Sequence, residues 1–209
     1  NASLRRARDF MRAQNFHLPP FAFWTPADWA ASGPEARQIA ATKLGWDITD
    51  FGRGDFRRYG LFLFTLRNGS PDNWKTLQGK LYAEKIMMAE DGQETPLHFH
   101  WSKMEDIINR GGGNLMIQVF NALPDETLDE SGEVTLSVDS VERRFPAGGT
   151  LTLTPGESIS LPQYCYHRFW AEGGPVLIGE VSLVNDDDHD NRFLDQKPRF
   201  PDVEEDEPP

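Results

Sequence analysis

Residues 92–112 read GQETPLHFHWSKMEDIINRGG, and this stretch places two histidines and a glutamate at close spacing. His98 and His100 are two residues apart, so both imidazoles project from the same face if the stretch forms a β-strand. A tight hairpin through residues 101–104 would bring Glu105 up on the neighbouring strand. Neutral imidazoles together with a carboxylate suit divalent Mn, Fe, Co, Ni or Zn. The stretch therefore predicts part of a metal site carried by β-strands.

A second stretch farther along the chain supplies a third histidine. Gly156 is followed by Pro162, and His167 lies five residues beyond this proline in an aromatic segment. The two stretches resemble the two metal-binding motifs of the cupin superfamily, and this resemblance implies a metal held by His98, His100, Glu105 and His167. The second stretch departs from the family form at Tyr164 and Ala171, where glycine and asparagine are usual. These departures affect a turn and a polar support and leave the ligands in place.

The region that contains both stretches, residues 59–184, has the pattern of many short strands. Segments rich in β-branched and aromatic residues alternate with turn sequences such as Asp91-Gly92. The expected strands are residues 59–66, 80–89, 115–121, 135–138, 151–154, 158–161, 164–170 and 176–184. Such a series favours a mainly β fold of the jelly-roll kind. Together with the two motifs, it predicts a cupin jelly-roll β-barrel.

Residues 1–58 predict a helical and aromatic N-terminal cover of the same domain, packed outside the barrel. Three helices are expected, one capped by Ser3, one over residues 25–32 and one over residues 34–44 with Gly45 as its stop. Prolines 19 and 20 exclude a helix between the first two. The aromatic residues of this segment need a large surface to pack on, and the barrel is the expected surface.

The net charge of the chain bears on the class of partner. The chain has 209 residues, with 21 Lys and Arg against 33 Asp and Glu, and a net charge of −12. An acidic surface repels phosphate backbones, so nucleic acid is not an expected partner. The acids are dense in residues 185–209, expected to form an acidic C-terminal extension whose run Glu204-Glu205-Asp206-Glu207 is solvated.

Other sequence features concern compartment and cofactor class. The one cysteine, Cys165, excludes an internal disulfide, and no apolar run approaches the length of a membrane span. These features predict a cytoplasmic protein without a membrane partner. No GxGxxG follows an expected strand into a helix, and no GxxxxGK[ST] occurs, so neither a dinucleotide site nor a P-loop is expected. No Lys-Ser/Thr pair follows the run Gly111-Gly112-Gly113. This run therefore predicts a tight turn or a β-bulge.

The wider sequence resembles one family of cupins, the D-lyxose isomerase family. The similar segments are TPLHFHWSKMEDIINRGGGNL (95–115), NFHLPPFAFW (15–24), YAEKI (82–86), EVSLVNDD (180–187) and DNRF (190–193). The resemblance implies a manganese-dependent aldose–ketose isomerase, usually a homodimer. It would interconvert D-lyxose and D-xylulose, and often D-mannose and D-fructose, through a cis-enediol. It also implies that the small-molecule partner is a free sugar.

Lys103 and Glu180 are the candidates for catalytic proton transfer. Lys103 precedes Glu105 by two residues, so it either faces the barrel interior or lies at a solvated hairpin tip. Inside the barrel, burial beside a cationic metal would lower its pKa. Glu180 shares a strand face with apolar residues, and we expect it to act as general base or to pair with Lys85. Lys85 also lies on an apolar strand face, either as a substrate-binding residue or as an edge residue that reaches solvent.

The remaining candidate substrate-binding residues follow the last expected strand, and they are Asp187, Asp190, Arg192 and Phe193. Two alternative functions would use the same metal ligands. One is an Fe(II)-dependent cupin dioxygenase, which would consume oxygen together with its substrate. The other is a non-catalytic cupin that binds a metal or a sugar and tolerates the loss of Lys103 and Glu180.

Overall fold

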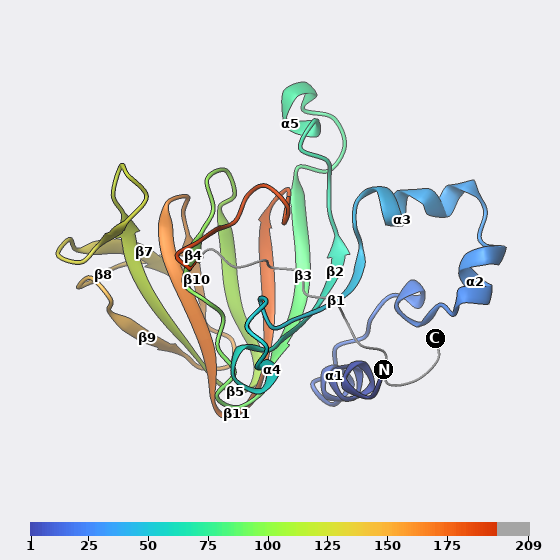
Figure 1. Cartoon of the computed structure of the whole chain (residues 1–209), viewed down its shortest axis with the longest axis horizontal. Coiled ribbons are helices and arrows are strands. Elements are labelled where there is room, and N and C mark those ends of the chain that lie inside the picture. The colour runs from blue at the N-terminus through green and yellow to red at the C-terminus, as the bar shows by residue number, and fades with distance from the viewer. Residues whose placement is uncertain (196–209) are drawn as a thin grey trace.

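Two long strands, β5 (Glu105–Ala122) and β11 (Cys165–Leu183), pair along most of their length and form the centre of the fold (Figure 1). This computed structural model describes residues 1–195, so the run 204–207 lies outside the described residues. The register of the two strands shifts between Glu172 and Val176. Opposite this shift, a Cβ added to Gly112 would lie 2.2 Å from the carbonyl oxygen of Pro175, and the φ of Gly112 is +91°. The glycine run is therefore a bulge within a strand, as expected.

The bend at this bulge lets the two halves of each long strand pair with different neighbours. The main path through the sheet has the order β1 (Gly45–Thr49), β2 (Leu61–Arg67), β3 (Tyr82–Ala89), β11, β5, β10 (Ser158–Leu161), β7 (Val134–Val138) and β8 (Val141–Phe145). The remaining pairings join β11 to β4 (His98–Phe99), β4 to β12 (Arg192–Phe193), and β5 to β6 (Leu128–Asp129) and β9 (Thr150–Leu153). Buried side chains from these strands form one core, which includes Leu63, Ile117 and Phe169. The predicted mainly β, cupin jelly-roll fold is confirmed.

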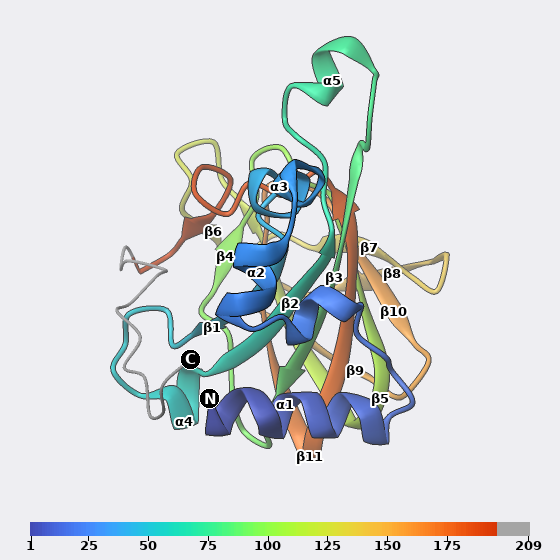
Figure 2. The ribbon, with the colours of Figure 1, turned by 90° about the vertical axis from the view of Figure 1, so that its right-hand side faces the viewer.

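The N-terminal helices lie outside the barrel, as expected. They are α1 (Ala2–Ala13), η1 (Pro20–Phe23), α2 (Pro26–Ala31), η2 (Pro34–Ala36) and α3 (Arg37–Ala41). Figure 2 shows α1, α2 and α3 on one side of the sheet. Because side chains alternate along a strand, β2 directs Leu61 and Leu63 into the barrel and Phe62 and Phe64 outward, where they join Met11 of α1 in a second buried cluster. Each buried phenylalanine contributes roughly 1.5–3 kcal/mol to this contact.

Several boundaries differ from the sequence-based expectation. Helix α1 begins after Asn1, so Ser3 lies inside the helix and is not its cap. Helix α2 begins as predicted, with Thr25 in a capping box with Asp28. The third expected helix ends at Ala41 and starts with a 3₁₀ turn. The segment expected to be only helical also contributes a strand, β1, to the sheet.

The observed strands differ from the expected ones mainly in length. The segments expected as strands 164–170 and 176–184 are one continuous strand, β11. The expected strand 115–121 is the second half of β5. Strand β8 was not predicted because its sequence, VERRF, is largely exposed and carries three charged residues. Short helices α4 (Phe56–Tyr59) and α5 (Asn73–Thr76) interrupt the connections around β2. Within residues 1–195, no helix has both the length and the apolar character needed to cross a membrane.

Candidate metal centre and active site

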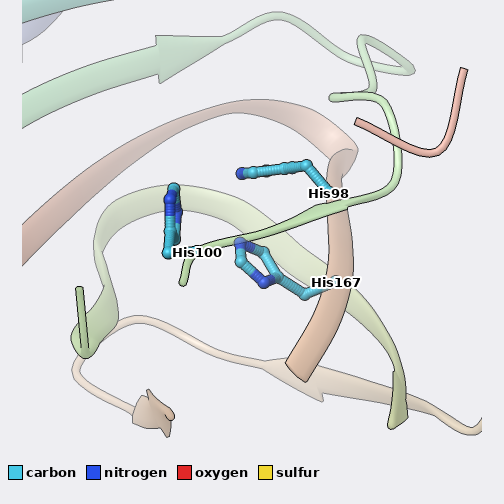
Figure 3. A group of neighbouring side chains, drawn as sticks. All are labelled: His98, His100 and His167. Atoms are coloured by element: carbon cyan, nitrogen blue, oxygen red, sulfur yellow. The ribbon is translucent and has the colours of Figure 1, made fainter. Parts of the chain in front are cut away.

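Three histidine side chains converge inside the barrel (Figure 3). His98 lies on β4, His100 directly follows this strand, and His167 lies on β11. His98 and His167 are opposite each other in the antiparallel pairing of β4 and β11. One ring nitrogen from each of the three lies within 4.8 Å of the others, a separation that allows a single ion to contact all three. The same-face placement expected for His98 and His100 therefore brings them together with His167.

Backbone carbonyl groups fix the tautomer of each imidazole. The Nδ1 atoms of His98, His100 and His167 lie 2.8, 2.5 and 3.0 Å from the carbonyl oxygens of Pro96, Asp190 and Cys165, respectively. A carbonyl oxygen can only accept, so each Nδ1 carries the proton and each Nε2 presents a lone pair. Burial lowers the pKa of His98 well below its usual value and also lowers the pKa of His100. His98 and His100 are therefore held in the neutral form that binds metals.

Glu105 adjoins this histidine cluster and remains charged. Its Oε1 lies 3.0 Å from Nε2 of His167 and 3.5 Å from Nε2 of His100, and its Oε2 lies 2.8 Å from Nζ of Lys103. Burial raises the pKa of Glu105, but the ammonium of Lys103 and the adjacent imidazole of His100 outweigh burial and leave this pKa well below its usual value. The sequence predicted Glu105 on a strand that forms a hairpin with the strand of His98 and His100. This prediction is wrong, because β4 pairs with β11 and β12. Glu105 reaches the site as the first residue of β5, which pairs with β11.

The contact between His167 and Glu105 indicates a cation. Nε2 of His167 is completely buried and makes no hydrogen bond among the described residues. Its lone pair and the carboxylate oxygen at 3.0 Å are both acceptors, and two acceptors at this distance repel each other unless a positive charge lies between them. Three imidazole nitrogens and one carboxylate oxygen are a suitable donor set for a divalent transition metal. The residues present therefore fit such an ion.

A chain of buried charges extends from Glu105 across the barrel. Lys103 Nζ donates a hydrogen bond to Glu180 Oε1 at 2.9 Å, and Lys85 Nζ lies 3.5 Å from the same oxygen. Lys85 also donates to Asn185 Oδ1 at 2.6 Å and to Asp187 Oδ1 at 3.5 Å. The two lysines face the three carboxylates of Glu105, Glu180 and Asp187, so the cluster carries one excess negative charge. A divalent ion at the histidines would convert this excess into one positive charge.

The protonation states of this network are set by the pairing. Burial lowers the pKa of Lys103, but the carboxylates of Glu105, Glu180 and Asp187 raise it by more, and the net result is a pKa well above the usual lysine value. The expected lowering of this pKa refers to Lys103 beside a bound metal, so for that state it stays a prediction. Burial raises the pKa of Glu180, but Lys103 and Lys85 outweigh it, so the net pKa is lowered. Lys103 is thus an ammonium donor and Glu180 a carboxylate.

These side chains line one cavity that is open to the ligand cluster. Its polar lining includes His98, His100, Lys103, Glu105 and Glu180 and the expected substrate-binding residues Lys85 and Asp187. Its apolar lining is Phe51, Leu61, Leu63, Met87, Ile107, Phe169 and the expected residue Phe193. The interior position of Lys85 and Lys103 excludes the solvent-exposed alternatives considered for both, since each is 3% exposed.

Two expected substrate-binding residues lie outside the cavity lining. The Asp190 carboxylate accepts hydrogen bonds from the backbone N–H groups of Ser102 and Lys103, at 2.8 and 2.9 Å. Its carbonyl oxygen accepts from His100. The Arg192 guanidinium donates to Glu126 at 3.0 Å and to the carbonyl oxygen of Phe193. Both residues therefore position neighbouring parts of the site, because their polar groups are engaged by protein atoms.

Sequence reasoning missed three residues at the cavity. Asn185 accepts from both Lys85 and Lys103 and donates to Asp187 Oδ2 at 2.7 Å. Asn191 lines the cavity and donates to the carbonyl oxygen of Asp187. Phe51 comes from the connection after β1. The one signal available was that both asparagines lie in or beside the segments quoted for the family resemblance, whereas nothing in the periodicity points to Phe51.

Comparison with known proteins extends these observations. The model of a family described as D-lyxose isomerase matches residues 1–209. The D-lyxose/D-mannose isomerases of Escherichia coli O157:H7 and Serratia proteamaculans are each 50% identical to this chain, over 100% of its length and 92% of theirs.

Solved structures show the same fold at low sequence identity. A mutant of Acinetobacter sp. DL28 L-ribose isomerase in complex with L-ribose has a TM-score of 0.59 at 15% identity and covers 94% of this chain and 91% of its own. Cellulomonas parahominis L-ribose isomerase with L-ribose has a TM-score of 0.55 at 16% identity and covers 93% and 90%. At these identities the similarity concerns the fold alone.

Proposed function

The chain belongs to the D-lyxose isomerase family and is an aldose–ketose isomerase, and from this premise we propose that it interconverts D-lyxose and D-xylulose, and D-mannose and D-fructose, with a divalent metal as cofactor. The sugars follow from the names of the two relatives at 50% identity. The observation that carries the metal is the approach of the unbonded Nε2 of His167 to Oε1 of Glu105 beside two further imidazole lone pairs. His98, His100, Glu105 and His167 are the proposed ligands. Mn²⁺ is the proposed ion, on the family resemblance.

The ion supplies one element of the chemistry when bound, a Lewis acid that stabilises negative charge on the sugar oxygens next to the reacting carbons. Isomerisation also requires that a proton leave C2 and arrive at C1, and that the hydroxyl proton move from O2 to O1. We assign the carbon-bound proton to Glu180. Both lysine contacts of this carboxylate are to Oε1, so Oε2 is the atom to which we assign the transfer.

The two lysines have separate roles in this proposal. We assign the hydroxyl proton to Lys103, which Glu105 and Glu180 hold as an ammonium, and which gives this proton to O1 and recovers it from O2. Lys85 is anchored by Asn185 and Asp187 and fixes the orientation of Glu180. The carboxylate of Asp187 binds a sugar hydroxyl, and Phe193 presents an apolar face to the sugar carbons. Asp190 and Arg192 act through the residues they position.

The test is metal removal and restoration. The protein is stripped with a chelator, Mn²⁺ is returned, and ketose formation from D-lyxose and D-mannose is followed. Activity that disappears with the ion and returns with Mn²⁺ supports the proposal. The absence of ketose from either sugar, or consumption of oxygen with Fe²⁺ in its place, would overturn it.

A homodimer in the cytoplasm is proposed on the family resemblance. The aromatic segment between α1 and α2 contributes little exposed surface to this argument, because Phe16 and Phe21 pack against the outer cluster of the sheet. Phe23, in contrast, is 46% exposed. Sedimentation analysis at micromolar concentration distinguishes a dimer from a monomer of 23.7 kDa.

A further inference from the structure

We propose that Phe51 sets the length of sugar that the cavity accepts, and so decides the preference between a five-carbon and a six-carbon aldose. The inference rests on the proposed isomerase function and assigns a specificity role to a residue outside the ligand and proton-transfer set. Phe51 lies between β1 and α4, is 5% exposed, and lines the same cavity as His98 and Glu180.

The backbone at Phe51 has a conformation that a bulky residue rarely adopts. Its φ is +56°, in the left-handed region, where a Cβ is disfavoured and glycine is the usual residue. The chain uses glycine for the same region at Gly52 and Gly54, with φ of +67° and +70°. Left-handed conformations of large side chains cluster at functional sites, where the surrounding structure holds them in place. Leu77 and Tyr164 share this backbone region but are exposed, whereas Phe51 is buried in the cavity lining, and this combination points to a role for its ring.

The loop is held in this shape by its own polar residues. Thr49 Oγ1 accepts a hydrogen bond from the backbone N–H of Phe51 at 2.9 Å. The carboxylate of Asp50 accepts from the N–H groups of Gly52 and Gly54, at 2.9 and 2.6 Å. These three bonds fix the backbone on both sides of Phe51. The ring is therefore presented to the cavity by a rigid turn and does not depend on a flexible loop.

A row of aromatic rings connects Phe51 to the metal ligands. The ring of Phe51 lies 5.8 Å from that of Phe193, and Phe193 stacks on His98 at 5.3 Å with an interplanar angle of 29°. These rings form one wall of the cavity, and the charged residues Lys85, Glu180 and Asp187 belong to the rest of the lining. In this proposal, a sugar held at its carbonyl end by the ligands places its remaining carbons against these rings.

The chemistry of the two proposed substrates makes this wall selective. D-Mannose is longer than D-lyxose by one CHOH unit, and both present the same reacting carbons to the site. The extra unit must be placed against the lining away from the reacting carbons. Phe51 is the apolar lining residue that comes from a turn, whereas Leu61, Leu63 and Met87 belong to the sheet itself. Its size therefore controls the space without affecting the strand pairing.

The test compares the ratio of kcat/KM for D-mannose to that for D-lyxose in the wild-type protein and in Phe51→Ala. We expect the ratio to rise by roughly tenfold, the effect typical of one carbon unit in an apolar pocket. Phe51→Leu is expected to raise the ratio by a smaller factor, and it decides the question if Phe51→Ala does not fold. Phe56→Ala is the matched control, because Phe56 follows closely in the chain but packs in the outer cluster.

Two results would overturn the inference, and they differ in meaning. An unchanged ratio in both Phe51 variants, with equal losses on the two sugars, would reduce Phe51 to a structural role while the proposed function stands. A wild-type protein that isomerises neither sugar would overturn the proposed function as well. A ratio that rises equally in Phe56→Ala would also contradict the inference, since this variant leaves the cavity lining unchanged.

Discussion

Lys85 of β3 and Glu180 of β11 lie directly opposite each other in the antiparallel pairing of these strands, with their charged atoms 3.5 Å apart inside the barrel. Their side chains are only 4% and 6% exposed, so neither charge is compensated by water. Such a pair is retained at a desolvation cost, and removing one member leaves the other charge buried. The strand register thus builds the proposed proton-transfer residue and its proposed orienting partner as one unit.

Replacement of Lys85 is expected to lower the stability of the folded protein. In Lys85→Met, Glu180 and Asp187 lose a buried cation while Glu180 keeps Lys103, so we expect a loss of about 3 kcal/mol in the free energy of unfolding. Urea denaturation measures this change. The control is Lys75→Met, because Lys75 and its partner Asp72 are both exposed, and this variant should leave the free energy of unfolding nearly unchanged. Equal effects in the two variants would contradict the buried pairing.

Glu180→Gln should separate chemistry from binding. The amide keeps the size of the side chain but cannot take up a proton, so kcat is expected to fall by about 10²–10⁴-fold. Bound Mn²⁺ per chain should be unchanged, because Glu180 contacts the lysines and is not a proposed ligand. A variant that retains most of its kcat would assign the proton transfer to another residue.

The histidine cluster is tested by metal binding itself. His98→Ala and His167→Ala each remove one of three imidazole ligands, and Mn²⁺ affinity should fall by more than about 100-fold, beyond the loss typical of outer residues. The affinity is measured by titrating the metal-stripped protein with Mn²⁺ and following the electron paramagnetic resonance signal of the free ion. His17→Ala is the control, because His17 is exposed and belongs to neither group of described side chains that could hold a metal ion. Wild-type affinity in His167→Ala would place the ion elsewhere.

Cys165 is expected to be unreactive in the folded protein. Burial, reinforced by the carboxylate of Glu105, raises the pKa of this thiol to about 12, and the residue is 3% exposed. At pH 8 the thiolate that reacts with disulfide reagents is therefore nearly absent. A chromogenic disulfide reagent should detect one thiol per chain after unfolding in urea and almost none before. Rapid reaction of the native protein would show that this part of β11 opens.

Strand spacing and alternation predicted a mainly β fold and the shared face of His98 and His100, and the family resemblance added His167 and Glu105 to the proposed metal site. The same-face rule for His98 and His100 holds because β4 is extended. The alternation of apolar residues placed Lys85 and Glu180 on the interior, and their antiparallel pairing makes them partners. These features depend on local geometry, which a sequence records directly.

Features that depend on contacts between distant segments were not predictable. Glu105 reaches the cluster through the pairing of β5 with β11, not through a hairpin with β4. The pKa of Lys103 is raised first by Glu105, two residues away, and then by Glu180 and Asp187, which arrive from the far end of the chain and could not be placed beside it from the sequence. Phe51 enters the cavity from a turn whose left-handed backbone is set by hydrogen bonds to side chains.

Metal-dependent isomerisation by proton transfer is tested most directly by incubating D-lyxose in D₂O with the Mn²⁺-restored protein and examining the product by NMR. Proton transfer through Glu180 predicts D-xylulose that carries solvent deuterium at C1, formed only when the ion is present. No ketose, or ketose formed equally well by the metal-stripped protein, would contradict the central claim. Ketose that contains no deuterium would contradict transfer through an exchanging carboxylate and favour direct hydride movement between the carbons.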